Sequence, residues 1–297
     1  MGTINIAMIT DTKYIRPTVV AIKSLQINCD KNNQYRIAIL TTNASDDDIA
    51  LLRDSETDNI KINIINQDKF AARLPAVNVS RHVSRAALLK FFLPDIFKSL
   101  DKILYLDSDV LILRDITDLW NTDISGVYAA VVKDVFSITN RDYMNNLGIR
   151  HEFYFNSGVM LLNLAKMRDD KIPEKLLKFR MTHDQVFMDQ DAFNAVIGNN
   201  VLYLPWWYNF LNCYLEYASP QQLSDLFTDD FNKSPVSIYT RSTILHLGGA
   251  AKPWMQDMGY LSKLYKRYYK RSNCKKYPLS FGKRHHSLWW HLRHWKF

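Results

Sequence analysis

The sequence predicts an α/β fold in which a mostly parallel sheet carries helices on both faces. Short apolar runs rich in β-branched residues alternate along the chain with helical patterns. The composition, with 47 % hydrophobic and 23 % charged residues, is that of a globular protein, and 297 residues suit one large domain with or without an appendage. Sheets of this kind bind ligands at the carboxyl ends of their strands.

The predicted elements begin with a buried strand at residues 4–9, an apolar run with β-branched side chains. A periodic stretch over residues 16–28, with Pro17 near its start, predicts the first helix. Ser45, followed by three aspartates, indicates another helix start, because acidic side chains are favoured at that end of the helix dipole. The remaining strands are expected at residues 37–40, 60–65, 102–106, 128–132, 159–164 and 201–204.

The segment around the fourth predicted strand carries the first chemical signal. Ser84 is expected to cap a helix over residues 85–92, which Pro94 bends or ends. The strand at residues 102–106 then runs directly into Asp107-Ser108-Asp109. A second acidic residue, Asp11, follows the first strand in the same way, so both are expected at the ligand-binding edge of the sheet.

Two carboxylates separated by one residue suit a divalent cation. An extended chain places Asp107 and Asp109 on the same side, and their hard oxygens favour magnesium or manganese. Such an ion would neutralise two phosphates and stabilise charge on a leaving group. Taken alone, however, the tripeptide could also be an ordinary polar strand end.

A second segment supplies complementary groups. His246 follows a strand-like pair at residues 244–245 and opens the run His246-Leu247-Gly248-Gly249-Ala250-Ala251-Lys252-Pro253-Trp254. Small residues allow the backbone to approach a ligand closely. Lys252 is expected to contact phosphate and His246 to complete the metal shell, unless the run is only a surface turn.

Charge is distributed unevenly along the chain. The net charge is +8, yet no Asp or Glu follows Asp257, whereas 11 Lys and Arg do. We therefore predict a body at residues 1–257 and a basic, aromatic C-terminal tail at residues 258–297. The three cysteines show no paired spacing, the N-terminus lacks signal-peptide features, and apolar runs are too short to span a membrane, so a cytoplasmic protein is expected.

The tail interleaves aromatic with basic residues, a composition that favours an anionic membrane surface. Leu261, Leu264, Tyr265 and Tyr268 fall at helical spacing, which predicts an amphipathic face and peripheral attachment to the inner face of the cell membrane. The alternative is a basic helix packed on the body. Nucleic acid is not an expected partner, because the body is acidic and the sequence holds no RNA-binding motif.

Five motifs in order resemble those of glycosyltransferase family 8, the retaining enzymes that include bacterial lipopolysaccharide galactosyl- and glucosyltransferases. The resemblance covers about residues 4–257. The motifs are Asp11 with Tyr14, the D-x-D of Asp107 to Asp109, Phe155-Asn156-Ser157-Gly158-Val159, Asp189-Gln190-Asp191, and the H-x-x-G-x-x-K-P-W of His246 to Trp254.

The resemblance implies a GT-A fold, a UDP-hexose donor (UDP-galactose or UDP-glucose), Mn²⁺ or Mg²⁺, and a glycan or glycolipid acceptor such as lipopolysaccharide. By position, Asp107, Asp109 and His246 would hold the metal. Roles in binding the nucleotide-sugar would fall to Asp11, Tyr14, Lys90, Asp107, Asp134, Gly249 and Lys252, and Asn156, Asp189 and Gln190 would surround the reacting sugar. Gln190 is a poor nucleophile, which favours front-face attack over a covalent intermediate.

The pattern departs from the family at two places. Lys90 stands where the family usually has Arg, which keeps the charge but loses the bidentate fork, so Arg85 could share its role. Thr12-Lys13 replaces acidic and amide residues near the nucleotide base. Structural roles also stay open at several positions: turn or cap residues for Asn156, Asp134 and Asp191, packing for Tyr14, and either core packing or acceptor stacking for Trp206, Trp207 and Tyr208.

The sequence therefore predicts a metal-dependent, retaining glycosyltransferase. Two other classes of protein share parts of this pattern. A haloacid dehalogenase-type phosphatase also places D-x-D-V after a strand, but there it is the first strand and a later acid motif is needed, which this sequence lacks. A non-catalytic nucleotide-sugar-binding protein at the membrane would bind UDP without turnover.

Overall fold

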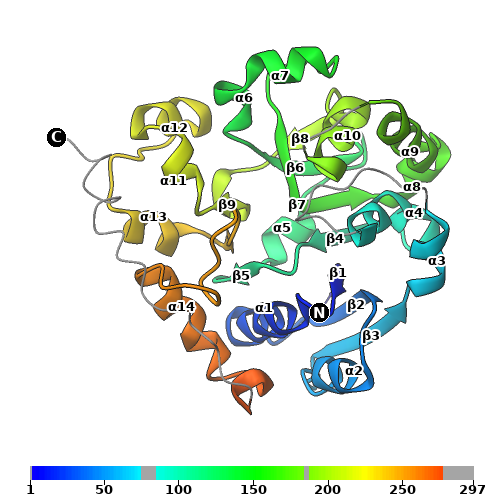
Figure 1. The fold of residues 1–297 in the computed structure, drawn as a ribbon, viewed down its shortest axis with the longest axis vertical. Helices are drawn as coiled ribbons and strands as arrows, with labels where there is room; N and C mark the ends of the chain where they lie inside the picture. Colours follow the sequence, from blue (N-terminus) through cyan, green and yellow to red (C-terminus); the bar gives the residue numbers. More distant parts are fainter. Residues whose placement is uncertain (1, 75–84, 184–186, 277–297) are drawn as a thin grey trace.

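The computed structural model describes residues 2–74, 85–183 and 187–276. A seven-stranded sheet forms its centre, in the order β3-β2-β1-β4-β7-β6-β8, and a three-stranded sheet, β5-β10-β9, lies beside it (Figure 1). The strands of the large sheet are β1 Thr3–Asp11, β2 Gln34–Thr42, β3 Ile60–Asn66, β4 Lys102–Leu106, β6 Ala129–Lys133, β7 Phe155–Asn163 and β8 Val201–Tyr203. Only β7 runs antiparallel to its two neighbours in this sheet, so the predicted mostly parallel α/β fold is confirmed.

Helices cover both faces of the large sheet, as Figure 1 shows. The α-helices are α1 Ile15–Asn28, α2 Asp46–Arg53, α3 Asp68–Arg73, α4 Leu93–Ile96, α5 Thr117–Asn121, α6 Phe136–Thr139, α7 Arg141–Asn146, α8 Leu164–Asp169, α9 Ile172–Thr182, α10 Met188–Ile197, α11 Tyr214–Tyr217, α12 Pro220–Phe227, α13 Pro235–Arg241 and α14 Tyr260–Tyr269. Three 3₁₀ helices are η1 Arg85–Phe92, η2 Trp206–Tyr208 and η3 Asn273–Lys276.

Alternate residues of each central strand belong to two different hydrophobic cores. In β4, Leu104 and Leu106 join the core beneath α1, whereas Ile103 and Tyr105 join the core beneath η1, α9 and α10. This division follows from the two-residue side-chain period of a strand. Because both faces are covered, the strands are apolar on both sides, which explains why they read in the sequence as continuous apolar runs.

Every strand expected from the sequence is present, although some bounds differ. β7 begins at Phe155 rather than at residue 159, so Asn156 and Gly158 lie within a strand. The helix predicted from residue 85 is the 3₁₀ helix η1, while Ser84, its expected cap, lies outside the described residues. The capping box of Ser45 confirms the predicted start of α2.

Two short strands were not predicted and build the small sheet. β5, Val110–Ile112, follows Asp109 directly and pairs antiparallel with β10, Ile244–His246. β9, Phe210–Leu211, pairs with the other side of β10. The small sheet therefore places His246, the last residue of β10, opposite Val110, which directly follows Asp109.

The beginning of the predicted tail is part of the body. α14 lies along α1 (Figure 1), and its residues Leu261, Tyr265 and Tyr268 are buried there. The Asn28 side chain donates to the Tyr268 hydroxyl at 3.0 Å, and Cys274 in η3 is fully buried against α1. The apolar face that we expected to meet a membrane is thus occupied by protein, and the packed-helix alternative describes residues 260–276. No described helix is long and apolar enough to cross a membrane.

Replacing Tyr265 by Ala tests how firmly α14 is docked. The ring is 1 % exposed and its centroid lies 5.1 Å from that of Trp254, so its removal leaves a cavity. We expect the free energy of unfolding to fall by about 3 kcal/mol, measured by denaturant titration. The control Lys263→Ala, at an exposed position of the same helix, should change it by less than about 0.5 kcal/mol. Equal effects of the two changes would contradict docking through this face.

Candidate functional site

A cavity of about 290 Å³ opens at the carboxyl ends of β1 and β4. Six of the residues expected to bind nucleotide, metal or sugar line it: Asp11, Tyr14, Lys90, Asp107, Asp109 and Asp189. They come from segments up to 178 positions apart in sequence, counted from Asp11 to Asp189. The sheet therefore gathers the predicted site at the edge where parallel strands bind ligands.

The three expected metal ligands form one cluster. Oxygens of Asp107 and Asp109 and a ring nitrogen of His246 all lie within 4.8 Å of one another. The Nε2 atom of His246 is 3.2 Å from Asp109 Oδ1 and 3.8 Å from Asp107 Oδ2. Among the described residues, this is the one group of three acidic, His or Cys side chains with such spacing. Two carboxylates and an imidazole fit a small divalent cation in both ligand type and number.

Backbone contacts hold the two aspartates in place. The Asp107 N–H donates to the carbonyl of Gly158 in β7 at 2.7 Å, and the Asp109 carbonyl accepts from Leu247 N–H at 2.8 Å. Between them, Ser108 points the other way: its hydroxyl donates to the Ile9 carbonyl at 2.9 Å. Both carboxylates therefore reach the same cluster, as expected, but the chain turns at residues 108–109 instead of staying extended.

Gly158 is required by the close approach of His246 and Asp107. A Cβ atom at this position would lie 2.3 Å from the His246 ring and 2.7 Å from an Asp107 oxygen. Either group would have to move away from the cluster to accommodate a side chain. The Gly of the F-N-x-G-V motif therefore has a steric explanation in this chain.

Lys252 lies against the cluster and neutralises part of its charge. Its ammonium group is 2.6 Å from Asp109 Oδ2 and also donates to the Leu247 carbonyl at 2.6 Å. Burial alone would raise the pKa of Asp109, but Lys252 and His246 outweigh it and the pKa falls well below its usual range. Asp109 is therefore a carboxylate at neutral pH, as a metal ligand must be. Gly249, in the same loop, has a φ of +83°, which favours glycine.

Lys90 bridges two carboxylates that line the cavity. Its ammonium lies 3.0 Å from Asp107 Oδ1 and 2.6 Å from Asp189 Oδ2. Burial would lower the pKa of Lys90, but these two carboxylates raise it, so the group stays charged. Arg85, which the sequence suggested could share this role, has a side chain outside the described part of the chain.

Asn156 and Gln190 are held against each other behind the cavity. Asn156 donates through Nδ2 to Gln190 Oε1 at 2.8 Å, and the Ser157 N–H donates to the same oxygen at 3.2 Å. The Ser157 hydroxyl donates to Asp189 Oδ2 at 2.9 Å. Hydrogen bonds thus connect residues of the F-N-x-G-V motif to residues of the D-Q-D motif.

Two other carboxylates are buried. Asp134 lies beside Asn156 and Tyr214, and burial raises its pKa. Asp191 accepts from the hydroxyls of Tyr143 and Tyr154 and from the Phe187 N–H, which anchors the start of α10. Asp191 therefore has the structural role, as a cap residue, that the sequence left open.

Aromatic residues lie at the cavity and beside the small sheet. Tyr14 precedes α1, and its ring meets the edge of Trp254 at a centroid distance of 6.2 Å. Trp206 is 2 % exposed and donates to Asp229 at 2.7 Å, so it serves core packing rather than an exposed stacking surface. Trp207 and Tyr208 are partly exposed.

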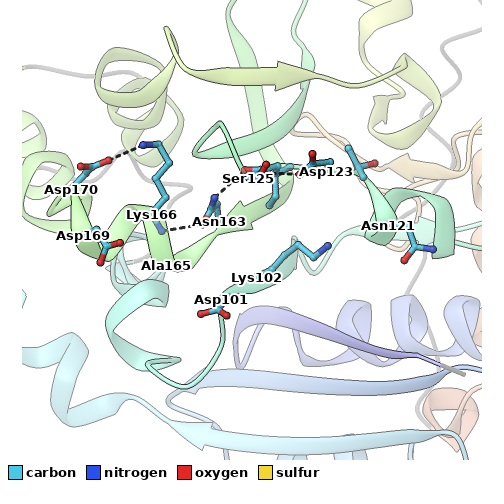
Figure 2. Close-up of a pocket in the computed structure, with 12 residues that line it drawn as sticks. Asp101, Lys102, Asn121, Asp123, Ser125, Asn163, Ala165, Lys166, Asp169 and Asp170 are labelled. Atoms are coloured by element: carbon cyan, nitrogen blue, oxygen red, sulfur yellow. Dashed lines mark hydrogen bonds and ion pairs between the residues drawn. The ribbon is translucent and has the colours of Figure 1, made fainter.

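A larger hollow of about 800 Å³ lies at the opposite end of β4 (Figure 2). Both of its lysines already have partners: Lys166 pairs with Asp170 at 3.1 Å, and Lys102 donates to the Trp120 carbonyl at 2.8 Å. It contains none of the motif residues and lies away from the carboxyl end of β4. We therefore assign the functional site to the smaller cavity.

The sequence did not single out several residues that support this site. Tyr105 donates to Asp107 Oδ1 at 2.6 Å, and its position two residues before Asp107 was the available signal. Asn209 contacts both Asn156 and His246, yet it stands outside every recognised motif. Its contacts depend on the three-dimensional path of η2 and β9.

The fold and the site together define a glycosyltransferase of the GT-A type. The profile of glycosyl transferase family 8 matches residues 5–258, and the chain belongs to this family. Lipopolysaccharide 1,2-glucosyltransferase of Escherichia coli (strain K12) is 33 % identical over 269 residues, which cover 88 % of this chain and 76 % of that protein. General stress protein A of Bacillus subtilis (strain 168) is 28 % identical, covering 84 % and 87 %.

Solved structures agree with this assignment. The galactosyltransferase LgtC, in complex with donor and acceptor sugar analogs, superimposes with a TM-score of 0.75 at 27 % identity, covering 91 % of this chain and 96 % of LgtC. The bifunctional glycosyltransferase WbbM in its apo form shares the fold, with a TM-score of 0.76 at 19 % identity. The phosphatase and the non-catalytic alternatives are not favoured by these matches.

Replacing Gly158 by Ala tests the packing of the cluster. The added methyl group would displace His246 or Asp107, and a displacement of about 1 Å in such a site costs about 100-fold in rate. We expect donor turnover, measured as UDP release, to fall by about this factor while the melting temperature changes little. Gly126→Ala, where a Cβ atom meets nothing within 4 Å, is the control. Normal turnover by Gly158→Ala would show that the ligands tolerate more space than the structure gives them.

Proposed function

We propose that this protein is a retaining hexosyltransferase that uses a UDP-hexose and a divalent cation, manganese or magnesium, and acts on a lipid-linked or cell-surface glycan. The observation that carries the proposal is the convergence of Asp107, Asp109 and His246 in one cluster that two lysines contact. A bound divalent cation would supply charge neutralisation for the diphosphate as the sugar departs.

The charges of the cavity suit a metal diphosphate. Three carboxylates face two ammonium groups: Asp107, Asp109 and Asp189 against Lys90 and Lys252. These groups together carry one net negative charge, which attracts a divalent cation. With the cation in place the balance becomes positive, and a doubly negative diphosphate is then favoured. Neither state requires an uncompensated buried charge of more than one unit.

The positions of the lining residues favour one orientation of the UDP-hexose in the cavity. Tyr14 and Asp11 stand at the end of β1, where they would contact the uracil. Gly249 and Lys252 lie on the loop after β10, where the backbone and an ammonium group would hold the diphosphate. The hexose would then lie toward Lys90, Asp189 and Asn156, with Asp134 behind them.

The arrangement around Gln190 supports front-face attack. Its Oε1 atom already accepts hydrogen bonds from Asn156 and from the Ser157 backbone, and a neutral amide is a poor nucleophile. Gln190 would position the sugar, while the acceptor hydroxyl attacks from the side of the departing phosphate. A phosphate oxygen would accept the hydroxyl proton, and UDP would leave with the bond electrons.

The acceptor class is proposed from the relatives. The Escherichia coli relative is named a lipopolysaccharide glucosyltransferase, and LgtC is a galactosyltransferase. A lipid-linked acceptor requires access to a membrane surface. The exposed basic residues of α14 and the sequence at residues 277–297, which holds three tryptophans and four Lys or Arg, would provide that attachment. Residues 277–297 lie outside the described part of the chain.

The change Asp109→Asn tests the metal assignment. The amide removes a charged ligand and the partner of Lys252. Even a supporting residue of a metal site contributes about 10–100-fold, so turnover should fall by more than about 100-fold. The measurement is UDP release across UDP-galactose, UDP-glucose and other UDP-sugars, with Mn²⁺ and membrane glycolipid as acceptor.

Asp123→Asn is the matched control, because Asp123 is exposed and lines the larger hollow instead. It should leave UDP release unchanged. Full activity of Asp109→Asn would remove the metal assignment, and a failure of the unaltered protein to release UDP from every donor would refute the proposed transferase.

Removal of residues 277–297 tests the membrane proposal. The shortened chain keeps α14 and Cys274, so it should fold and release UDP at the normal rate. Each basic residue near an anionic surface contributes about 1 kcal/mol, so binding to vesicles of phosphatidylglycerol should weaken more than about tenfold. Vesicles of phosphatidylcholine alone provide the baseline. Undiminished binding to anionic vesicles would contradict attachment through this segment.

A further inference from the structure

A buried asparagine connects the sugar side of the cavity to the metal side. Asn209, between η2 and β9, is fully buried and belongs to none of the family motifs. Its Nδ2 atom lies 2.9 Å from Asn156 Oδ1, and its Oδ1 atom lies 3.1 Å from His246 Nδ1. A buried amide that meets both groups has a fixed donor side and a fixed acceptor side, and this determines which ring nitrogen of His246 carries a proton.

A backbone group determines which atom donates and which accepts along this series of hydrogen bonds. The Gly158 N–H can only donate, and it lies 2.9 Å from Asn156 Oδ1, so this atom of Asn156 is the amide oxygen. The atom of Asn209 that approaches the same oxygen must then be its NH₂ group. Asn209 therefore turns its own oxygen toward His246, and an oxygen of this kind can only accept.

It follows that His246 Nδ1 carries a hydrogen. In the neutral ring, Nε2 then presents its lone pair to Asp109 and Asp107, at 3.2 Å and 3.8 Å. A lone pair facing carboxylate oxygens is unfavourable unless a positive charge lies between them, either a proton on Nε2 or a metal cation, and only the metal-bound form needs the lone pair free. Metal-binding histidines commonly donate their second N–H to a protein oxygen in this way, which fixes both tautomer and ring orientation.

We propose that Asn209 is a positioning residue that fixes His246 in the tautomer with Nε2 free to bind the divalent cation. The inference rests on the proposed metal-dependent function and adds a residue to it. Asn156 also donates to Gln190 Oε1. The same series of hydrogen bonds therefore links the proposed metal ligand His246 to the residues proposed to hold the sugar. The full path runs Gln190, Asn156, Asn209, His246, with the Gly158 N–H setting its direction.

The test compares three variants by Mn²⁺ binding in the presence of UDP, with free Mn²⁺ measured by electron paramagnetic resonance. Asn209→Leu has a similar size but cannot accept from His246 Nδ1, so the dissociation constant for Mn²⁺ should rise about 10–100-fold. Asn209→Asp still accepts from Nδ1 but gives up the hydrogen bond to Asn156 Oδ1, so it should bind Mn²⁺ more tightly than Asn209→Leu does. Asn33→Leu replaces a buried asparagine at the opposite end of β1 and should leave the constant unchanged.

A second measurement distinguishes the positioning of His246 by Asn209 from a general structural role of Asn209. Electron spin echo measurements on bound Mn²⁺ detect the imidazole nitrogen, and this signal should persist in Asn209→Asp and weaken in Asn209→Leu. Should Asn209→Leu fail to fold, Asn209→Ser replaces it, because its shorter hydroxyl does not reach the ring.

The outcomes distinguish this inference from the function on which it rests. If the unaltered protein does not bind Mn²⁺ with UDP, the metal proposal and this inference both fail. If the unaltered protein binds Mn²⁺ and Asn209→Leu binds it equally well, only the role of Asn209 is refuted. Equal weakening in Asn209→Leu and Asn209→Asp would also refute it, because the acceptor oxygen would then have no separate effect.

Discussion

The site depends on the close approach of three strands around two carboxylates and an imidazole. β4 brings Asp107 and Asp109 to the sheet edge and β10 brings His246. β7 contributes Gly158, which has no side chain and so leaves room for His246 and Asp107. Like charges at this distance repel unless positive groups compensate them. The lysines at positions 90 and 252 provide that compensation in the ligand-free protein, and their burial keeps the interaction strong.

The sequence predicted the large sheet because its strands are buried on both faces and read as continuous apolar runs. It also predicted that Asp107, Asp109 and His246 come together, since D-x-D and the His246 loop carry their chemistry in local patterns. The small sheet escaped prediction because strands of two or three residues show no periodicity. The pairing of Lys90 with Asp189, 99 positions away, depends on the packing of η1 against α10, which no local pattern encodes.

The C-terminal tail shows another limit of prediction from the sequence. An amphipathic helix has the same apolar spacing whether it meets lipid or protein, so the pattern at Leu261, Tyr265 and Tyr268 could not distinguish the two. The structure places this face against α1. Asn209 marks a further limit, because its importance follows from hydrogen-bond directions and not from its residue type. Asparagines at turns are common, and only the contacts with Asn156 and His246 make this one distinctive.

The burial of all three cysteines gives the protein an internal reporter of local opening. Cys29 lies at the end of α1, Cys213 beneath the glycines that precede Lys252, and Cys274 beneath the C-terminal 3₁₀ helix. Burial raises the pKa of Cys213 to about 12 and that of Cys274 to about 11, so both thiols are unreactive at neutral pH while they remain enclosed. Alkylation of Cys274 would thus report lifting of the C-terminal segment, and alkylation of Cys213 would report movement of the loop at Gly248 and Gly249.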